Sequence, residues 1–544
     1  MTVKAYASGN KKIVEAGKFT DALKGSKEEA GHAFDSSSAQ SFVSSQLSAS
    51  DSAIPESLAK VFDSASPEVQ TKLVTTISDS ISAYEERHNC EVPPDIMNQV
   101  IHNVGVILDD ASSEGSSPTG LQTAQALVSI QATLAAAVPF AHYATSENTE
   151  VPIAILNRYS AGANGMYAEG GSIDGINSGK TLMGAARAHT ITMPASGAAT
   201  AKLTAIQTDI DVCDQNADAV AFLPGRGVLL HNGRPIALEH VPVSGGASTI
   251  SGTASIGGTS YTITGTFNSG NGDLSVTLAP ANEGLELVFE SYVKFEGNES
   301  LIPGIGVSVA VKSMYAMDWK GYTEITREAF EQLNRELGLD GRSEGMIGIQ
   351  TQFTNERHYT LLINAVRLAQ GNLRQFNLEY TDRKANMAVA DMWRDLMSVV
   401  DATSQTMAEQ TNSHGVGFMY VTGGMARFMR SLPREIFTPS GQPARPGIYR
   451  MGTLSNGIEV YYTPRILKDG PTTSQILLIG RGNDVARSAF VMGDVVPPML
   501  RDFDPGKALA ERAAFYGKNF TGINPHEITW GSAALVEVSG MPAQ

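Results

Sequence analysis

The alternation of hydrophobic and polar positions is clearest between residues 415 and 498, and it predicts a mixed unit of strands and one short helix. Residues 415–422 form an apolar run of strand length that leads into two glycines. Residues 425–432 follow with helical spacing, and Pro433 is a stop signal for that helix.

The second half of this stretch predicts further strands. Residues 454–464 contain Asn456 and Gly457, which can adopt the positive φ angles of a two-residue hairpin turn. Residues 475–480 are mostly apolar, which is typical of a strand with both faces covered. Residues 489–492 predict one more strand after a short turn.

Helical spacing dominates two other regions. Residues 343–370 predict one helix, which would span roughly 40 Å at about 1.5 Å per residue. Residues 381–409 predict a second helix, with an apolar stripe of Ala385, Ala388, Met392, Leu396, Val399 and Thr403. Near the N-terminus, helices are predicted from Ser66, Pro93 and Thr119. The first of these carries Val69, Leu73, Ile77 and Ile81 on one face.

Residues 186–300 predict a separate β-rich module. Within it, residues 261–267 and 274–278 alternate apolar with small polar side chains, which is typical of an antiparallel pair with one buried face. Residues 235–293 contain no Lys or Arg, and this abrupt change of composition marks a domain boundary.

The C-terminal segment is predicted to contain a helix at residues 507–517 and a closing strand at residues 533–538. We expect that strand to pair with residues 305–312, whose apolar positions also alternate. The chain end would then return to the layer that holds the long helix.

The chain has 544 residues, too many for one core, so several domains are expected. Its formal net charge is −16, and the first 150 residues hold 19 acidic against 9 basic side chains. Such a charge argues against a protein that coats nucleic acid, but not against a shell around DNA. Residues 36–66 include 12 serines and are expected to be flexible. Residues 1–140 are therefore interpreted as an extended acidic arm that straps neighbouring subunits, with an ordinary helical domain as the alternative.

Cysteine content and hydropathy indicate the cellular compartment in which the protein is made. The only cysteines are Cys90 and Cys213, so no disulfide framework and no cysteine zinc site is expected. The N-terminus lacks the apolar segment of a secretory signal. Residues 126–144 are interrupted by polar residues and a proline, which predicts a buried helix rather than a membrane span. We expect a protein that is made and kept in a cytoplasm.

Two motifs suggest small-ligand chemistry, and both are incomplete. Residues 175–181 resemble a phosphate-binding loop, but one intervening residue is missing and Asp174 stands where the first glycine should be. Residues 209–214 suggest a calcium loop without its central glycine, and Val220 occupies the position of the final glutamate. We predict no catalytic, cofactor-binding or metal site and no enzyme activity. Nucleotide binding is the enzymatic alternative.

The order of strand, short helix, hairpin, apolar strand, turn and strand in residues 415–498 resembles the axial domain of the HK97-type major capsid proteins of tailed bacteriophages, above all their large-myophage branch. The resemblance implies an α+β fold with an inserted β-rich domain. Its parts would be an N-terminal arm (1–140), the first part of an extended loop (141–185), the insertion domain (186–300), a peripheral domain with a long spine helix (301–412), an axial domain (413–500) and a C-terminal return to the peripheral domain (501–544).

This resemblance implies a structural protein that self-assembles into hexamers and pentamers of an icosahedral head. The head would enclose double-stranded DNA without sequence-specific binding. Portal, scaffold or decoration proteins are the further partners that it implies, with the virion capsid as location, the host cytoplasm during assembly, and no membrane. The alternatives are a β-rich viral adhesin or other virion structural protein, and an encapsulin-like cellular shell protein, which shares the fold.

The resemblance also implies a processing site. Related large-phage capsid proteins lose an N-terminal segment to a protease that cuts after Glu when an apolar residue lies two places earlier. Ile54, Pro55 and Glu56 match this pattern, so Glu56 is the processing candidate. Cleavage there would remove residues 1–56 before DNA enters the head.

Overall fold

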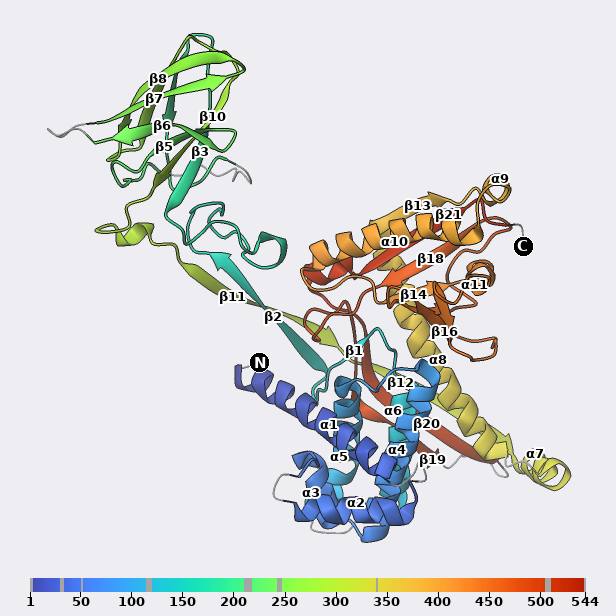
Figure 1. Ribbon diagram of the computed structural model, residues 1–544. Helices are drawn as coiled ribbons and strands as arrows, with labels where there is room; N and C mark the ends of the chain where they lie inside the picture. Colours follow the sequence, from blue (N-terminus) through green and yellow to red (C-terminus); the bar gives the residue numbers. More distant parts are fainter. Residues whose placement is uncertain are drawn as a thin grey trace. The chain divides into compact units, whose positions relative to one another are not determined.

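The computed structural model describes residues 3–29, 34–49, 52–113, 120–209, 218–241, 247–338, 341–503 and 510–542. The chain forms two compact units (Figure 1). Unit 1 comprises Met1–Ala154 and Val311–Gln544, and unit 2 comprises Ile155–Ala310. Both helices and sheets are present, so the predicted α+β class is confirmed.

Unit 1 begins with six helices that pack on one another. They are α1 (Val3–Glu29), α2 (Ser36–Ser48), α3 (Glu56–Ser64), α4 (Pro67–His88), α5 (Pro94–Ser113) and α6 (Gly120–Ala135). Helix α5 contacts α1, α3 and α6, while α4 contacts α2 and α6. Phe19, Phe42, Phe62, Leu73 and Val100 belong to one buried core. None of the described helices is long and apolar enough to cross a bilayer.

The interpretation of residues 1–140 as an extended arm does not fit this packing, and a helical domain is what the described residues form. The prediction that residues 36–66 are flexible is also wrong, because α2 and α3 lie within them. Asp35 caps α2 by accepting hydrogen bonds from the backbone N–H groups of Ser37 and Ser38. Phe42 and Val43 are buried while most of the serines are exposed. Contact with a neighbouring subunit stays a prediction.

A seven-stranded sheet follows in unit 1, in the order β13-β21-β18-β14-β17-β16-β15. The strands are β13 (Leu373–Asn377), β14 (Phe418–Val421), β15 (Phe437–Pro439), β16 (Tyr449–Leu454), β17 (Glu459–Tyr462), β18 (Ser474–Ile479) and β21 (Ala533–Ser539). Every residue of β18 is buried, as its apolar run predicted. Ile476 and Leu478 belong to the core on one side of the sheet, and Leu477 and Ile479 to the core on the other.

Helices cover both faces of this sheet. Helix α10 (Val389–Thr411) buries Met392, Leu396 and Val400 in the same core as α11 (Gly423–Arg430). The single helix predicted at residues 381–409 is wrong at its start, because the short α9 (Tyr380–Arg383) ends there and α10 begins only at Val389. Ala385 and Ala388, which the predicted stripe included, lie outside both helices and are exposed. On the opposite face, the C-terminal half of α8 (Gly341–Ala369) contributes Leu361, Leu362 and Ala365 to the core that it shares with the N-terminal helices. The long helix predicted at residues 343–370 is therefore confirmed.

A four-stranded sheet, in the order β1-β19-β20-β12, completes unit 1. Its strands are β1 (His142–Tyr143), β12 (Met317–Thr326), β19 (Phe490–Phe503) and β20 (Ala510–Ile523), and α8 packs against β12 and β20. The short helix α7 (Arg327–Gln332) follows β12. A buried ion pair ties these layers together. Asp494 on β19 lies 3.1 Å from the Arg357 guanidinium on α8, and it accepts a hydrogen bond from Asn103 on α5.

Two C-terminal predictions are wrong. Residues 507–517 are rich in helix formers, but from residue 510 they lie in β20, because pairing with β12 and β19 on both edges overrides local propensity. The closing strand β21 pairs with β13 and β18 instead of residues 305–312. Its apolar run requires cover on both faces, which an interior position in the seven-stranded sheet supplies.

Unit 2 contains an eight-stranded sheet in the order β3-β10-β5-β6-β7-β8-β9-β4. The strands are β3 (Ala186–Thr192), β4 (Ala198–Lys202), β5 (Val228–His231), β6 (Arg234–His240), β7 (Ser248–Ile256), β8 (Thr259–Asn268), β9 (Asp273–Ala279) and β10 (Glu286–Tyr292). They enclose their own core, which includes Phe222, Phe267 and Phe289. The chain enters along β2 (Glu150–Ser160) and leaves along β11 (Ile305–Tyr315), which pair as a two-stranded sheet. The exact limits of the six predicted parts stay predictions.

Candidate functional site

An exposed apolar surface runs along one face of β11. Ile305, Val307, Val309 and Val311 occupy every second position of this strand, and their exposed fractions are 45%, 60%, 59% and 51%. Side chains two residues apart in a strand point to the same side, so these four form a continuous row. We call this row the valine face.

The opposite face of the same ribbon has a different character. A Cβ atom at Gly306 would lie 2.4 Å from a ring carbon of Tyr159 on β2, so the tyrosine ring packs directly on the glycine backbone. Only glycine permits so close an approach. The ribbon therefore has one face on which the Tyr159 ring packs and one that presents branched apolar side chains to solvent.

The valine face has a thermodynamic cost when it is uncovered. A two-stranded sheet is marginally stable on its own in water. Burying a valine or isoleucine side chain completely contributes about 1.5–3 kcal/mol relative to leaving it exposed. Contact between this face and a complementary apolar surface is therefore strongly favoured.

A second apolar surface lies in unit 1, in a groove of about 330 Å³ between β12 and α8. Its aromatic lining includes Trp319 and Phe353, whose rings meet edge to face at 5.5 Å. Tyr322 also lines the groove and is 63% exposed. Gly345 permits the close packing of α8 on β12, because a Cβ atom there would lie 2.6 Å from the Thr323 hydroxyl.

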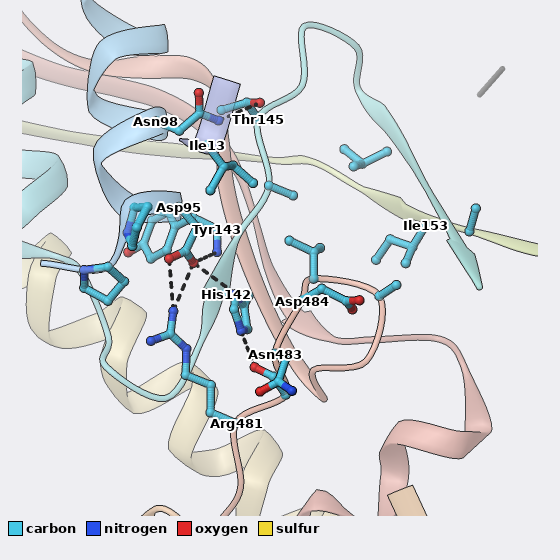
Figure 2. Close-up of a pocket in the computed structure, with 18 of the residues that line it drawn as sticks. Ile13, Asp95, Asn98, His142, Tyr143, Thr145, Ile153, Arg481, Asn483 and Asp484 are labelled. Carbon is cyan, nitrogen blue, oxygen red and sulfur yellow. Dashed lines mark hydrogen bonds and ion pairs between the residues drawn. The ribbon is translucent and has the colours of Figure 1, made fainter. Parts of the chain in front are cut away.

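A larger pocket of about 610 Å³ lies beside the N-terminus of α5 (Figure 2). The carboxylate of Asp95 accepts hydrogen bonds from the Arg481 guanidinium (3.1 Å) and from the backbone N–H of Tyr143 (2.9 Å). Nδ1 of His142 lies 3.1 Å from the same carboxylate, and its Nε2 lies 2.6 Å from the Gly482 carbonyl oxygen. The walls are largely apolar and include Ile13, Val151, Ile153, Val485 and Ala486.

Opposing effects set the charge of Asp95. Burial would raise its pKa, but the hydrogen bond from His142 and the positive charge of Arg481 outweigh burial and lower the pKa to about 2. The carboxylate is therefore ionised at neutral pH. It joins α5, β1 and the loop that begins at Arg481, so its evident role is to hold these segments together.

The predicted processing residue, Glu56, is the first residue of α3, and its carboxylate lies 3.2 Å from Lys60. Ile54, two positions earlier, is buried. The site therefore lies at a helix start rather than in a flexible stretch. Cleavage after Glu56 stays a prediction.

The incomplete ligand motifs do not become sites in the described residues. Gly175–Asn177 form a short 3-10 turn, and Asp174 accepts a hydrogen bond from the backbone N–H of Arg158 at 3.0 Å. The suggested calcium loop falls at residues 209–214, and all but Asp209 lie outside the described residues. Across the described part of the chain, no group of three His, Cys, Asp or Glu side chains is arranged to hold a metal ion. The absence of enzyme activity stays a prediction.

Sequence reasoning missed both the valine face and the Asp95 cluster. The alternation in residues 305–312 predicted a strand correctly, but not that its apolar side is exposed. The partners of Asp95 are 47 and 386 positions away in the chain. No spacing rule could have linked them.

Comparisons with known proteins give structural similarity only. No family model and no curated protein matches the chain. The capsid of the jumbo bacteriophage PhiKZ matches with 9% identity, 73% of this chain, 91% of that chain and a TM-score of 0.35. The capsid of Myoviridae phage XM1 matches with 11% identity, 61% and 95% coverage and a TM-score of 0.30. The SrpI encapsulin from Synechococcus elongatus matches with 11% identity, 44% and 80% coverage and a TM-score of 0.29.

Proposed function

We propose that this protein is the major capsid protein of a tailed bacteriophage, a shell subunit that assembles with copies of itself. The observation that carries the proposal is the valine face of β11, four branched apolar side chains that are about half exposed. A row of this kind on a two-stranded ribbon favours contact with another molecule.

A second copy of the chain is the partner that fits. The same chain carries the aromatic groove between β12 and α8, with Trp319, Tyr322 and Phe353 in its lining. A ribbon that packs into the groove of the next copy makes a head-to-tail contact, and such contacts generate rings when the rotation closes. Hexamers and pentamers of an icosahedral head are the rings we propose.

The order of the elements supports the same function. A two-stranded ribbon flanks a β-rich insertion, the long helix α8 follows, and the seven-stranded sheet with α10 and α11 comes after it. This is the order implied by the resemblance to HK97-type capsid proteins. We propose the virion capsid as location, assembly in the host cytoplasm, enclosed double-stranded DNA, and portal, scaffold or decoration proteins as further partners.

The test is a double substitution, Val307→Asp with Val309→Asp, compared with Ser308→Asp on the opposite face of the same strand. We expect the unmodified protein and the Ser308 variant to form rings or shells in negative-stain micrographs. The double variant should stay monomeric in sedimentation while keeping its circular dichroism spectrum, because two charges cannot be buried at the contact without a large desolvation cost.

Three results would oppose the proposal. One is normal assembly of the double variant. Another is an unmodified protein that is monomeric at every salt and protein concentration. A stable trimer in sedimentation would instead favour a β-rich adhesin.

A further inference from the structure

The charge of the chain is reversed in one part of unit 1. Against a net charge of −16 for the whole chain, residues 423–468 hold seven basic and only two acidic side chains. Six of the seven are arginines. Arginine presents a planar set of donors that matches phosphate oxygens, so this composition differs from a surface that is merely solvated.

Four of these basic side chains lie on α11 or beside it, and all four are exposed. We call them the basic face: Arg427, Arg430, Arg434 and Lys468. Arg427 and Arg430 are three positions apart on α11, so they share one side of the helix. The other side of α11 is buried through Met425, Phe428 and Met429.

Contacts within unit 1 hold the flanking loops against α11. The guanidinium of Arg430 lies over the ring of Tyr449, 6.0 Å from its centroid, and donates to the tyrosine hydroxyl. Asp469 accepts a hydrogen bond from the backbone N–H of Gly424 at 3.1 Å, which places its neighbour Lys468 beside the first turn of the helix.

The other charged side chains of this stretch are engaged elsewhere. Arg450 is buried and paired with Glu459. Arg465 lies over the ring of Tyr359, 4.3 Å from its centroid. Glu435 lines a separate pocket together with Trp393 and Arg394. Arg445 follows Gln442, which donates hydrogen bonds to the carbonyl oxygens of Glu86 and Arg87 at the end of α4. Asp469 lies beside the basic face through its hydrogen bond from Gly424, and four basic side chains against this carboxylate leave a net positive charge.

We propose that the basic face contacts the phosphate backbone of double-stranded DNA without reading its sequence. This inference rests on the proposed function, because a shell protein meets the DNA that it encloses. Repulsion by the acidic remainder of the chain would confine contact with DNA to this one face. Each contact can be weak, since a shell repeats it in every copy.

An acidic protein surface is the rival partner, and the structure favours DNA over it. The most acidic part of this chain is its first 150 residues. Several of the carboxylates there already pair with lysines of the same helices, as in Lys11–Glu15, Lys60–Glu56 and Lys72–Glu68. Lys24 likewise lies within 3.4 Å of both Glu85 and Glu91.

The experiment measures binding of the full-length protein to a fluorescent 30-base-pair duplex of mixed sequence, between 50 and 300 mM salt. The test variant is Arg430→Gln, Arg434→Gln and Lys468→Gln. The control variant, Lys11→Gln, Lys12→Gln and Lys18→Gln, changes the net charge equally on α1, where all three lysines are exposed. Circular dichroism verifies that both variants are folded.

We expect affinity to fall with salt and to be equal for a duplex of scrambled sequence. At 50 mM salt the test variant should bind at least about tenfold more weakly, and its slope of log affinity against log salt should be smaller by about three. The control variant should bind within about twofold of the unmodified protein.

Three outcomes would overturn the inference. The first is no binding by the unmodified protein at 50 mM salt, and the second is equal loss in both variants. The third is a test variant that binds DNA normally but no longer assembles, which would assign the face to an acidic partner. Micrographs of the same samples keep the two proposals separate. Shells without DNA binding would refute only this inference, and DNA binding without shells only the proposed function.

Discussion

Single charged residues hold distant segments of unit 1 together. Asp494 joins α5, α8 and β19, and Asp95 joins α5 to β1 and to the loop at Arg481. A buried carboxylate is tolerated only where positive charges and hydrogen bonds replace the water that it has lost. Each of these two buried carboxylates is therefore expected to contribute to stability through the segments that it joins.

We predict that Asp95→Asn lowers the free energy of unfolding by about 2 kcal/mol at pH 7. The pKa of this carboxyl is lowered to about 2 in the folded chain from an ordinary value of 3.8. Its contribution is therefore fully present above about pH 4 and is lost as the pH falls toward 2. Urea unfolding at a series of pH values should show the difference between the two proteins shrinking over that range.

Asp79→Asn, on an exposed position of α4, is the matched control and should show little difference at any pH. A difference for Asp95→Asn that stays constant from pH 7 to pH 2.5 would contradict the assignment.

At the level of elements, the N-terminal helices form layers over α4 and α5. Helix α1 contacts α5, and α2 contacts α4. Together α1 and α2 bury Phe19, Leu23, Phe42 and Val43. Removing residues 1–56 would uncover this surface, so the proposed cleavage after Glu56 has a cost for the folded subunit.

We predict that a chain that starts at Ser57 unfolds with a free energy at least about 4 kcal/mol lower than that of the full-length chain, because four large apolar side chains leave the core. Urea unfolding measures this change, and the binding of a hydrophobic dye reports the uncovered surface. Equal stability of the two chains would show that α1 and α2 contribute little.

Mass spectrometry of protein from mature particles tests the cleavage itself. A new N-terminus at Ser57 would support Glu56 as the processing residue. An intact Met1 or Thr2 terminus would exclude Glu56 as the processing residue.

At the scale of the whole molecule, the β-rich insertion has its own core and closely spaced ends. The backbone N–H of Val293 donates to the carbonyl oxygen of Ala185 at 2.8 Å, so a short connection can replace everything between them. The insertion core shares no residue with the two large cores of unit 1.

We predict that replacing residues 186–292 by Gly-Gly leaves unit 1 folded. The shortened chain should be soluble, with a cooperative thermal transition measured by circular dichroism. Loss of all soluble expression would show that unit 1 depends on the insertion. Negative-stain micrographs of the shortened chain would then tell whether the insertion is needed for assembly.

The amino-acid sequence was sufficient to predict the elements whose apolar spacing has a single interpretation. The buried strand β18, the long helix α8 and the buried positions Met392 and Leu396 of α10 were predictable, because side-chain spacing in one element reflects the face that it buries. The separate β-rich module was predictable from the alternation of apolar and polar positions and from the lack of Lys and Arg in residues 235–293. The resemblance to capsid proteins rested on the order of such elements.

Other features depend on contacts between distant segments of the folded chain. The helix formers at the start of β20 became a strand because two neighbouring strands pair with it. The serine-rich segment is helical because a few of its apolar side chains pack into a buried core. The valine face and the basic face were hidden for a related reason. Alternation and composition reveal which residues share a side, but whether that side meets a core, solvent or a partner depends on contacts between segments far apart in the chain.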